Sequence, residues 1–210
     1  MSIALFSETI TSERELRSIL GDPSHRVLAK HVTSLDRHCR AFIAKCPFVV
    51  VGSGDRQGAI DVSPKGDPPG LVQVLDDTTL AVPERLGNRK ADTFSNILQN
   101  DRVGLLFLIP GKHETLRVSG RGAIVRDRWL RDRFVVNDRA PELVLVVSVL
   151  EVFFHCTKCM LRSHLWDPSK WPDVTGLPTL ARAMVDAGRL SESVDEMQAL
   201  IANDVSHRLY

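Results

Sequence analysis

The feature that most constrains the fold is a close succession of short apolar runs between residues 48 and 154. Each run is rich in β-branched or other apolar residues, and turn-forming residues such as Asp76-Asp77 separate neighbouring runs. Strands joined by short turns pair antiparallel, whereas parallel strands need a crossover of a dozen or more residues. The spacing therefore predicts an antiparallel barrel rather than a βαβ sheet. The runs cover residues 48–51, 59–63, 71–75, 78–82, 103–109, 114–125 and 143–154.

Helical patterns flank this region on both sides and interrupt it once. Capping boxes, formed by Ser12 with Glu15 and by Ser193 with Glu196, open two of these helices. Because 210 residues fit one domain, we expect a single domain in three parts. These parts are an N-terminal helical segment (1–46), a barrel (47–166) and a C-terminal helical extension (167–210) that packs on the barrel. The expected helices cover residues 12–20, 34–45, 89–99, 180–186 and 193–206.

The charge balance argues against whole classes of partner. The formal net charge is +1, which provides no general attraction to nucleic acid or to anionic membranes. No run reaches the roughly 18 uncharged apolar residues that a membrane helix needs. Residues 1–18 lack the basic start and the small-residue cleavage site of a signal peptide. We therefore expect a cytoplasmic protein with neither a nucleic-acid nor a membrane partner.

The cysteines divide into two pairs. Cys39 and Cys46 lie in or beside the helical pattern at 34–45, and we expect them in the core. Cys156 and Cys159 form a C-x-x-C pair, which could suggest zinc, but no second pair of suitable ligands accompanies it. A thioredoxin-like role also lacks its βαβ setting. We expect free thiols and no metal site.

A basic turn introduces the helix expected at 89–99. Asn88 is suited to cap this helix, which places Arg89 and Lys90 in its first turn. Cations there oppose the helix dipole, at a cost of ~0.3–1 kcal/mol per exposed charge, and a bound anion would reverse that sign. Two interpretations of this pattern are about equally favoured: a phosphate site, or two solvated side chains at a frayed helix start.

A second basic and polar element lies on the turn at 63–70. Ser63 is expected to end a strand, and Pro64 and Gly66 would stiffen and sharpen the exit of the chain. The Ser63 hydroxyl and the Lys65 ammonium could then face a common ligand. Taken alone, this segment is also compatible with a plain surface turn, which is the more frequent case.

Five motifs in a fixed order connect these elements. The order of SPKG, PG, GNRKADTFSNILQN, RVGLLFLIPG and LRVSGRG resembles that of the pyridoxamine 5′-phosphate oxidase-like FMN-binding split-barrel proteins. Residues 155–166, which read HCTKCMLRSHLW, are similar to a segment of a long bacterial subfamily of that group. The resemblance covers about residues 30–170, with a further echo in the closing residues 208–210.

The resemblance implies a six-stranded split barrel that forms a homodimer with FMN at the interface. Arg89 and Lys90, after Asn88, match the family's pair on the FMN phosphate, and Ser63 and Lys65 match residues that face the isoalloxazine ring and the ribityl chain. The other cofactor-binding residues that it implies are Val82 and Pro83, whose backbone would follow the flavin, Thr115 and Arg117 on a closing strand, and Arg162 and Trp166, which would reach the flavin from the partner subunit.

The expected function is an FMN-dependent oxidoreductase acting on a small molecule. Lys65 is the candidate cation beside the flavin N1–C2 edge, where it would stabilise the anionic reduced form. No catalytic acid or base stands out. Residues 178–210 do not match the substrate-binding tail of the pyridoxal phosphate-forming oxidases, which argues against pyridoxamine phosphate as the substrate. A non-catalytic flavin carrier and a haem-handling split barrel remain alternative readings.

Overall fold

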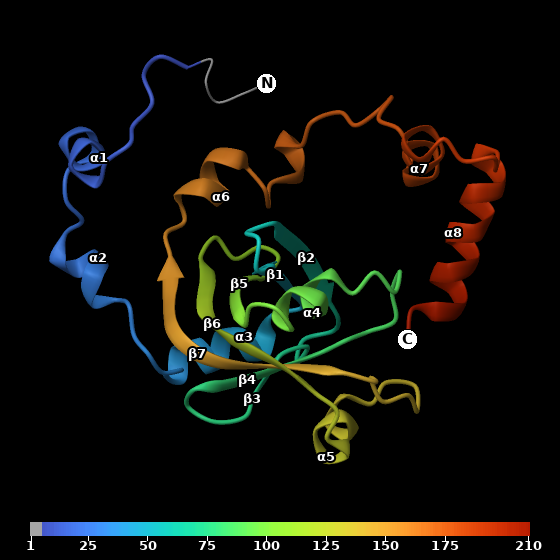
Figure 1. Ribbon diagram of the computed structural model, residues 1–210, viewed down its shortest axis with the longest axis horizontal. Helices are drawn as coiled ribbons and strands as arrows, with labels where there is room; N and C mark the ends of the chain where they lie inside the picture. Colours follow the sequence, from blue (N-terminus) through green and yellow to red (C-terminus); the bar gives the residue numbers. More distant parts are fainter. Residues whose placement is uncertain (1–5) are drawn as a thin grey trace.

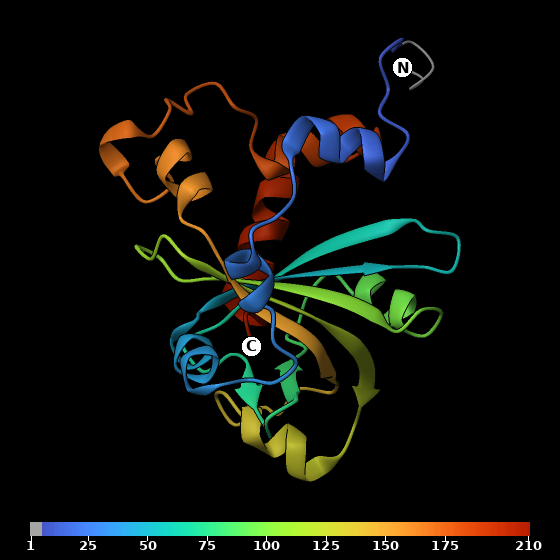
Figure 2. The ribbon, with the colours of Figure 1, turned by 90° about the vertical axis from the view of Figure 1, so that its left-hand side faces the viewer.

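A single antiparallel sheet forms the centre of the molecule. The computed structural model describes residues 6–210, and its sheet has seven strands in the order β2-β1-β5-β6-β7-β4-β3. Figures 1 and 2 show this sheet curving around the core. The strands are β1 (Phe48–Gly54), β2 (Ile60–Gly66), β3 (Gln73–Val74), β4 (Thr79–Pro83), β5 (Arg102–Leu108), β6 (Thr115–Val125) and β7 (Val144–His155).

The antiparallel, mainly β fold predicted from the strand spacing is confirmed. All of the strand pairs run antiparallel, as short connections require. Each of the seven apolar runs contains or overlaps one strand, and the six-stranded barrel that the resemblance implies has one strand fewer because it does not include the two-residue β3, which pairs with β4. The edge strands β2 and β3 do not pair with each other among residues 6–210, so the barrel is open along one side.

Four of the five predicted helices are present near their expected positions. The structure contains α1 (Glu13–Leu20), α3 (Arg37–Lys45), α7 (Leu180–Gly188) and α8 (Val194–Arg208), close to the expected ranges. Ser12 and Ser193 cap α1 and α8 as predicted. The shorter helices are not predicted, because a segment of three to six residues is too short to show a helical period. These are α2 (His25–Ala29), α5 (Arg128–Arg131) and α6 (Lys158–Ser163), and the 3₁₀ turns η2 (Asp132–Phe134) and η3 (Pro168–Lys170).

The core fills the inside of the curved sheet. Alternate residues of each strand point inward, so Val49 and Val51 of β1 are fully buried, as is Phe107 of β5. Helix α3 closes one side of the core with Phe42 and Ile43. The register of β6 shifts at Gly120, where a Cβ atom would collide with the backbone carbonyl of Ser148. This bulge helps the long strand β6 to bend.

Two helical arms lie outside the barrel, on opposite sides in Figure 1. A bridge between Val32 and Val152 joins the N-terminal arm, α1 and α2, to β7. The C-terminal arm consists of α7 and α8, which contact each other, and the end of α8 returns to the barrel. The division into three parts and the packing of 167–210 stay predictions, and residues 1–5 of the first part lie outside the described residues. No helix within 6–210 is long and apolar enough to cross a membrane.

Candidate functional site

Strand β2 presents one polar face toward a pocket. Residues two apart on a strand share a face, and Asp61, Ser63 and Lys65 are the half-buried members of alternating positions on β2. The expectation that Ser63 ends its strand is wrong, because β2 continues to Gly66 and Pro64 pairs with Val50. Proline is tolerated there because β2 is an edge strand, whose outward N–H groups need no partner in the sheet.

The pocket lies between β2, the segment that follows β4, and the last residues of the chain. Its volume is about 570 Å³, within the range of small-molecule sites of ~300–1,000 Å³. Of the predicted cofactor-binding residues, the pocket brings together Ser63, Lys65, Pro83, Asn88 and Arg89. We call this the β2 pocket. Its other lining residues are Pro64, Gly66, Leu71, Glu84, Arg85, Leu86, Gly87, Ala91, Phe94, Leu143, Arg208, Leu209 and Tyr210.

The basic turn differs from its prediction. Helix α4 (Asp92–Ile97) begins three residues later than expected, and its N-cap is Ala91, without a side-chain cap. Asn88 instead accepts a hydrogen bond from the Lys90 backbone N–H, with 2.9 Å between Oδ1 and N. Asparagine closes such turns as readily as it caps helices. Arg89 and Lys90 therefore precede the helix, and the argument from the helix dipole does not apply to them.

The backbone of this turn is strained. Arg89 and Ala91 both have left-handed φ values, 63° and 56°. A side chain with a Cβ atom resists this conformation by roughly 1–2 kcal/mol per residue. Strain of this kind concentrates at binding and catalytic sites, where the surrounding structure holds it. The turn is therefore a candidate ligand-binding element.

The two cations of the turn have different surroundings. The Arg89 side chain makes no hydrogen bond or ion pair to any residue in 6–210 and lines the β2 pocket. The Lys90 ammonium lies 2.6 Å from a carboxylate oxygen of Asp92, which raises the pKa of Lys90. Lys90 lines an adjoining cavity of about 260 Å³ together with Asp61 and Thr93. Within the described chain, Arg89 is thus the free cation of the β2 pocket, and Lys90 is already paired.

Lys65 also has a partner that the sequence did not reveal. Its ammonium lies 2.7 Å from a carboxylate oxygen of Glu84, and both groups are less than one third exposed. Glu84 follows β4 directly, and no sequence pattern links it to a residue on β2. The pair holds the Lys65 side chain along the pocket wall.

A second ion pair lies beside the β2 pocket and involves Arg85, which lines it. Asp67, whose side chain is almost fully buried, accepts a bond of 2.7 Å from the Arg85 guanidinium and another of 2.7 Å from the Tyr210 hydroxyl. Arg85 also donates to the backbone oxygen of Phe134 and lies over the Tyr210 ring. The hydrogen bond to Asp67, with some help from burial, raises the pKa of Tyr210.

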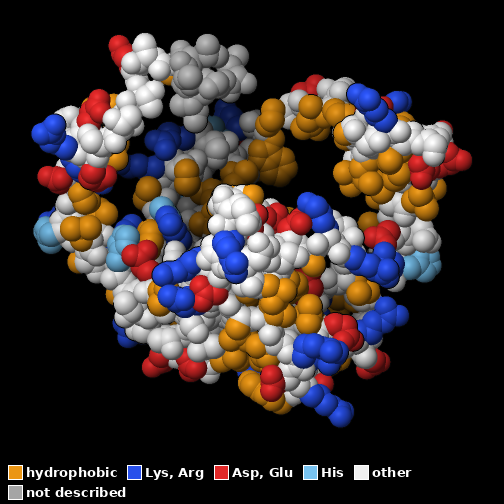
Figure 3. Space-filling model, viewed as in Figure 1, with side chains coloured by type: hydrophobic (Ala, Val, Ile, Leu, Met, Phe, Trp, Pro, Cys, Tyr) orange, Lys and Arg blue, Asp and Glu red, His pale blue; other side chains and the backbone are white. Residues whose placement is uncertain are grey.

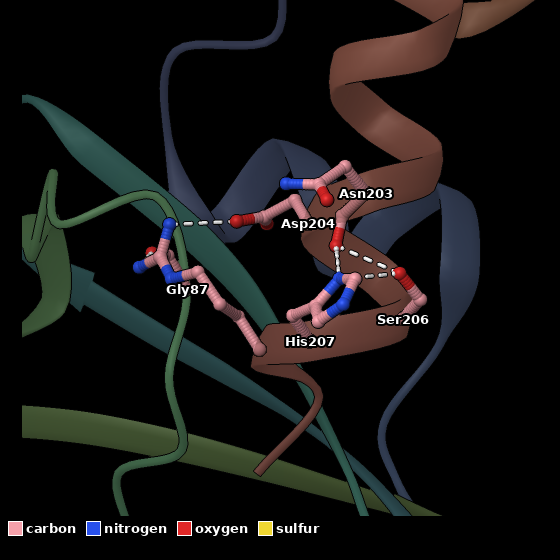
Figure 4. A network of polar contacts seen from close by, with 6 residues as sticks. Gly87, Asn203, Asp204, Ser206 and His207 are labelled. Carbon is pink, nitrogen blue, oxygen red and sulfur yellow. Dashed lines mark hydrogen bonds and ion pairs between the residues drawn. The ribbon is translucent and has the colours of Figure 1, made fainter.

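The end of α8 is tied to the basic turn (Figure 4). Arg208 donates to the backbone oxygen of Gly87 at 3.2 Å and pairs with Asp204, one helical turn earlier, at 2.6 Å. Gly87 immediately precedes Asn88 and Arg89, so α8 anchors the turn that carries the free cation. In the sequence, Arg208 and Tyr210 carry no signal apart from the family resemblance of residues 208–210.

The remaining predicted cofactor residues do not line the β2 pocket. Val82 belongs to the core, at 2% exposure. Thr115 is buried on β6, and the guanidinium of Arg117 lies over the ring of Phe153. The Trp166 indole N–H donates to the backbone oxygen of Lys112, beyond α6, the helix that contains Arg162. A contribution of these five residues to a cofactor site stays a prediction, and for Arg162 and Trp166 it is expected to come from a partner subunit.

The cysteines occupy the expected environments. Cys39 and Cys46 are buried, Cys156 and Cys159 are exposed, and all four are free thiols. Burial raises the pKa of Cys39 to about 12 and also raises the pKa of Cys46. Within residues 6–210, no group of three or more histidine, cysteine or acidic residues is placed to hold a metal ion.

Comparisons with solved structures return proteins of low identity. One is HupZ from Group A Streptococcus, 18% identical, covering 57% of this chain and 92% of that one at a TM-score of 0.48. A putative pyridoxamine 5′-phosphate oxidase from Lactobacillus delbrueckii is 23% identical over 58% of this chain and 95% of its own, at 0.46. An FMN-binding protein from Syntrophomonas wolfei is 15% identical over 68% and 93%, at 0.45.

No curated protein matches the chain. The family evidence comes from a sequence model described as pyridoxamine 5′-phosphate oxidase, which matches residues 35–156. The match includes α3, every strand of the barrel and the basic turn, and it therefore spans more than half of the 210 residues. This chain belongs to the pyridoxamine 5′-phosphate oxidase family.

Proposed function

We propose that this protein is an FMN-binding flavoprotein that uses the β2 pocket for its cofactor and acts as an oxidoreductase on a small molecule. The observation that carries the proposal is the free Arg89 guanidinium on the rim of a 570 Å³ pocket whose wall carries Ser63 and Lys65. An anionic group and a large planar ring need this combination of a cation, short polar side chains and space. Bound FMN would supply the redox chemistry.

The residues present fit such a cofactor. Arg89 can donate to a phosphate with its whole guanidinium, since it has no competing partner in the described chain, and Lys90 adds positive charge from the adjoining cavity. The Ser63 hydroxyl makes no hydrogen bond within residues 6–210 and faces the same pocket. It is available to a ribityl hydroxyl. The strained backbone at Arg89 and Ala91 is also accounted for by a ligand that the turn must meet.

The Lys65–Glu84 pair sets the charge along the pocket wall. A cation beside a flavin favours the reduced anion, and Glu84 moderates that effect because it lies 2.7 Å from the Lys65 ammonium. Glu84 also orients the long Lys65 side chain, which otherwise has many rotamers. In the proposed function, Lys65 acts on the cofactor and Glu84 positions Lys65.

A homodimer is part of the proposal. The arms carry exposed apolar side chains that a second copy could cover, among them Leu28 on α2, Leu180 on α7 and Leu200 on α8. Figure 3 shows apolar side chains gathered on the C-terminal helices. Apolar patches of this kind mark interaction surfaces. In a dimer, Arg162 and Trp166 of the second copy would complete the cofactor site.

A titration with FMN tests the proposal. We expect the purified protein to be yellow or to bind added FMN at one per subunit, with quenching of the flavin fluorescence. Under anaerobic conditions, NADPH should then bleach the flavin absorbance, and an acceptor should restore it. A protein that neither contains nor binds FMN would overturn the proposal. Binding without any turnover would restrict the function to a flavin carrier.

A further inference from the structure

A second cavity adjoins the β2 pocket on the side of Tyr210. Its volume is about 360 Å³, and it shares Glu84, Arg85, Leu86, Leu143 and Tyr210 with the β2 pocket. Its own walls are Arg139, Ala140, Pro141 and Glu142, from the segment that leads into β7. We call it the Tyr210 cavity. The shared residues mean that a molecule in the Tyr210 cavity would lie next to the contents of the β2 pocket.

Each charged side chain around the Tyr210 cavity already has a partner in the protein. Arg85 binds Asp67 and the Phe134 backbone oxygen, and Arg139 donates to the backbone oxygen of Tyr210 at 2.7 Å. Of the acids, Glu84 pairs with Lys65, and Glu142 lies 3.3 Å from each of two arginines, Arg126 and Arg131. An anion or a cation that entered would have to share or displace one of these partners and would lose part of its hydration, which is costly.

The remaining surface of the cavity is apolar. Leu86, Leu143, Ala140 and Pro141 line it, and Tyr210 lines both this cavity and the β2 pocket. Leu86 is 52% exposed although it lies beside a cavity, so its side chain is available to a ligand. Covering such side chains yields about 25 cal/mol for each Å² of apolar area removed from water.

The position of Tyr210 is fixed from three directions. Its hydroxyl donates to Asp67, its backbone oxygen accepts from Arg139, and its ring packs against the Arg85 guanidinium, 5.6 Å from the ring centre. These contacts hold the ring in one place, so it can act as a shaped wall. A side chain that is fixed in this way can select ligands by size and charge.

We infer that the Tyr210 cavity binds a neutral, mainly apolar ring compound and that Tyr210 determines its specificity. The binding of such a compound is independent of the cofactor, but its assignment as the substrate rests on the proposed function. A phosphorylated or carboxylated substrate is disfavoured because each cation of the cavity, Arg85 and Arg139, already has a partner within residues 6–210 that the substrate would have to share or displace. The substrate class is therefore neutral aromatic or quinone-like molecules small enough for about 360 Å³.

The test uses the fact that Tyr210 is the only tyrosine in the sequence. Protein labelled with carbon-13 tyrosine gives one set of ring signals, which reports on this cavity alone. The probes are naphthol and naphthalenesulfonate, which share their rings and differ in charge. We expect naphthol to shift the Tyr210 signals saturably, and naphthalenesulfonate to bind about tenfold or more weakly, because its charge would be buried unpaired. Equal or tighter binding of the sulfonate, or no shift with naphthol, would overturn the inference.

A variant separates this site from the cofactor site. Ala140 lines the Tyr210 cavity and not the β2 pocket, so Ala140→Phe should fill the cavity and abolish the naphthol-induced shift while leaving FMN affinity unchanged. Unaltered naphthol binding in this variant would also overturn the inference. The titrations are made on the full chain with and without FMN, so a protein that binds naphthol but not FMN contradicts the proposed function alone. The converse result contradicts only the inference.

Discussion

The hydroxyl of Tyr210 donates a hydrogen bond of 2.7 Å to Asp67, across a sequence separation of 143 residues. Asp67 follows β2 directly, so this bond ties the end of the chain to the strand that carries Ser63 and Lys65. The same Asp67 carboxylate holds Arg85, which lies beside both cavities. One buried carboxylate thus organises the wall between the proposed cofactor site and the proposed substrate site.

The titration of Tyr210 should reveal this bond. Its pKa is raised in the folded protein, chiefly because the neutral hydroxyl donates to Asp67. The resulting stabilisation is therefore fully present below the unfolded pKa of about 10 and is lost as the pH rises through the higher folded pKa. Tyrosinate absorbance should report a single group, since the chain has one tyrosine. In Asp67→Asn the pKa should fall, and an unchanged midpoint in that variant would contradict the assignment.

Loss of the free cation should weaken FMN binding. A charge-assisted phosphate contact contributes roughly 1.5–3 kcal/mol, so Arg89→Ala should lower FMN affinity by one to two decades. The added change Lys90→Ala should cost less, because Lys90 is exposed and paired with Asp92. Flavin fluorescence titration measures both effects. Arg128→Ala is the matched control, as that side chain is 91% exposed and lies on α5. Equal affinity of Arg89→Ala and the control would exclude the phosphate assignment.

Removing the partner of Lys65 should change the redox potential of bound FMN. In Glu84→Gln, the positive charge of Lys65 is no longer offset by a carboxylate 2.7 Å away, which favours the reduced anion. The potential should rise by about 30 mV, equivalent to ~1.4 kcal/mol for a two-electron couple. Lys65→Met should lower it. Anaerobic reduction against a reference dye measures the shifts, and a shift of the same sign in both variants would argue against a cofactor beside this pair.

The thiols should react in two classes. Cys156 and Cys159 are exposed, whereas Cys39 and Cys46 are buried and have raised pKa values, which keeps them protonated at neutral pH. A chromogenic disulfide reagent should therefore titrate two thiols rapidly in the native protein and all four in guanidinium chloride. Rapid reaction of more than two thiols under native conditions would show that the core around α3 opens easily.

Two strand glycines should respond differently to a methyl group. In Gly120→Ala the new Cβ would meet the Ser148 carbonyl and the Val147 side chain, so we expect the free energy of unfolding to fall by roughly 1–3 kcal/mol or more. Gly104→Ala, on the neighbouring strand β5, meets no atom within 4 Å and serves as the control. Urea unfolding measures both. Similar stability of the two variants would mean that the bulge at Gly120 relaxes at little cost.

The local patterns of the sequence were sufficient for most of the secondary structure. Strand runs joined by short turns specified antiparallel pairing, and two Ser-x-x-Glu patterns located the starts of α1 and α8, of which only Ser193 and Glu196 form the reciprocal capping box. The sequence places the start of α4 too early. An asparagine oxygen can accept a hydrogen bond from a backbone N–H two residues later both in a turn and at the start of a helix, so Asn88 does not distinguish the two. The left-handed φ of Arg89 and Ala91 is what makes this segment a turn. Neither residue type favours a left-handed φ, so the sequence does not predict the turn.

Some features of the candidate site also follow from the local sequence, and others depend on the tertiary structure. By itself, the sequence determined the strands, the amphipathic helices and the spacing of Ser63 and Lys65 two residues apart, because period and turn chemistry act over a few residues. That Arg89 lines the same pocket as these two residues was decided by the tertiary structure. Only the tertiary structure decided that Glu84 meets Lys65 and that Asp67 holds both Arg85 and Tyr210. These pairs form because chain folding brings distant segments together in a partly dry pocket, where an unpaired charge is costly. Their energies depend on that proximity, of which a linear sequence carries no local sign.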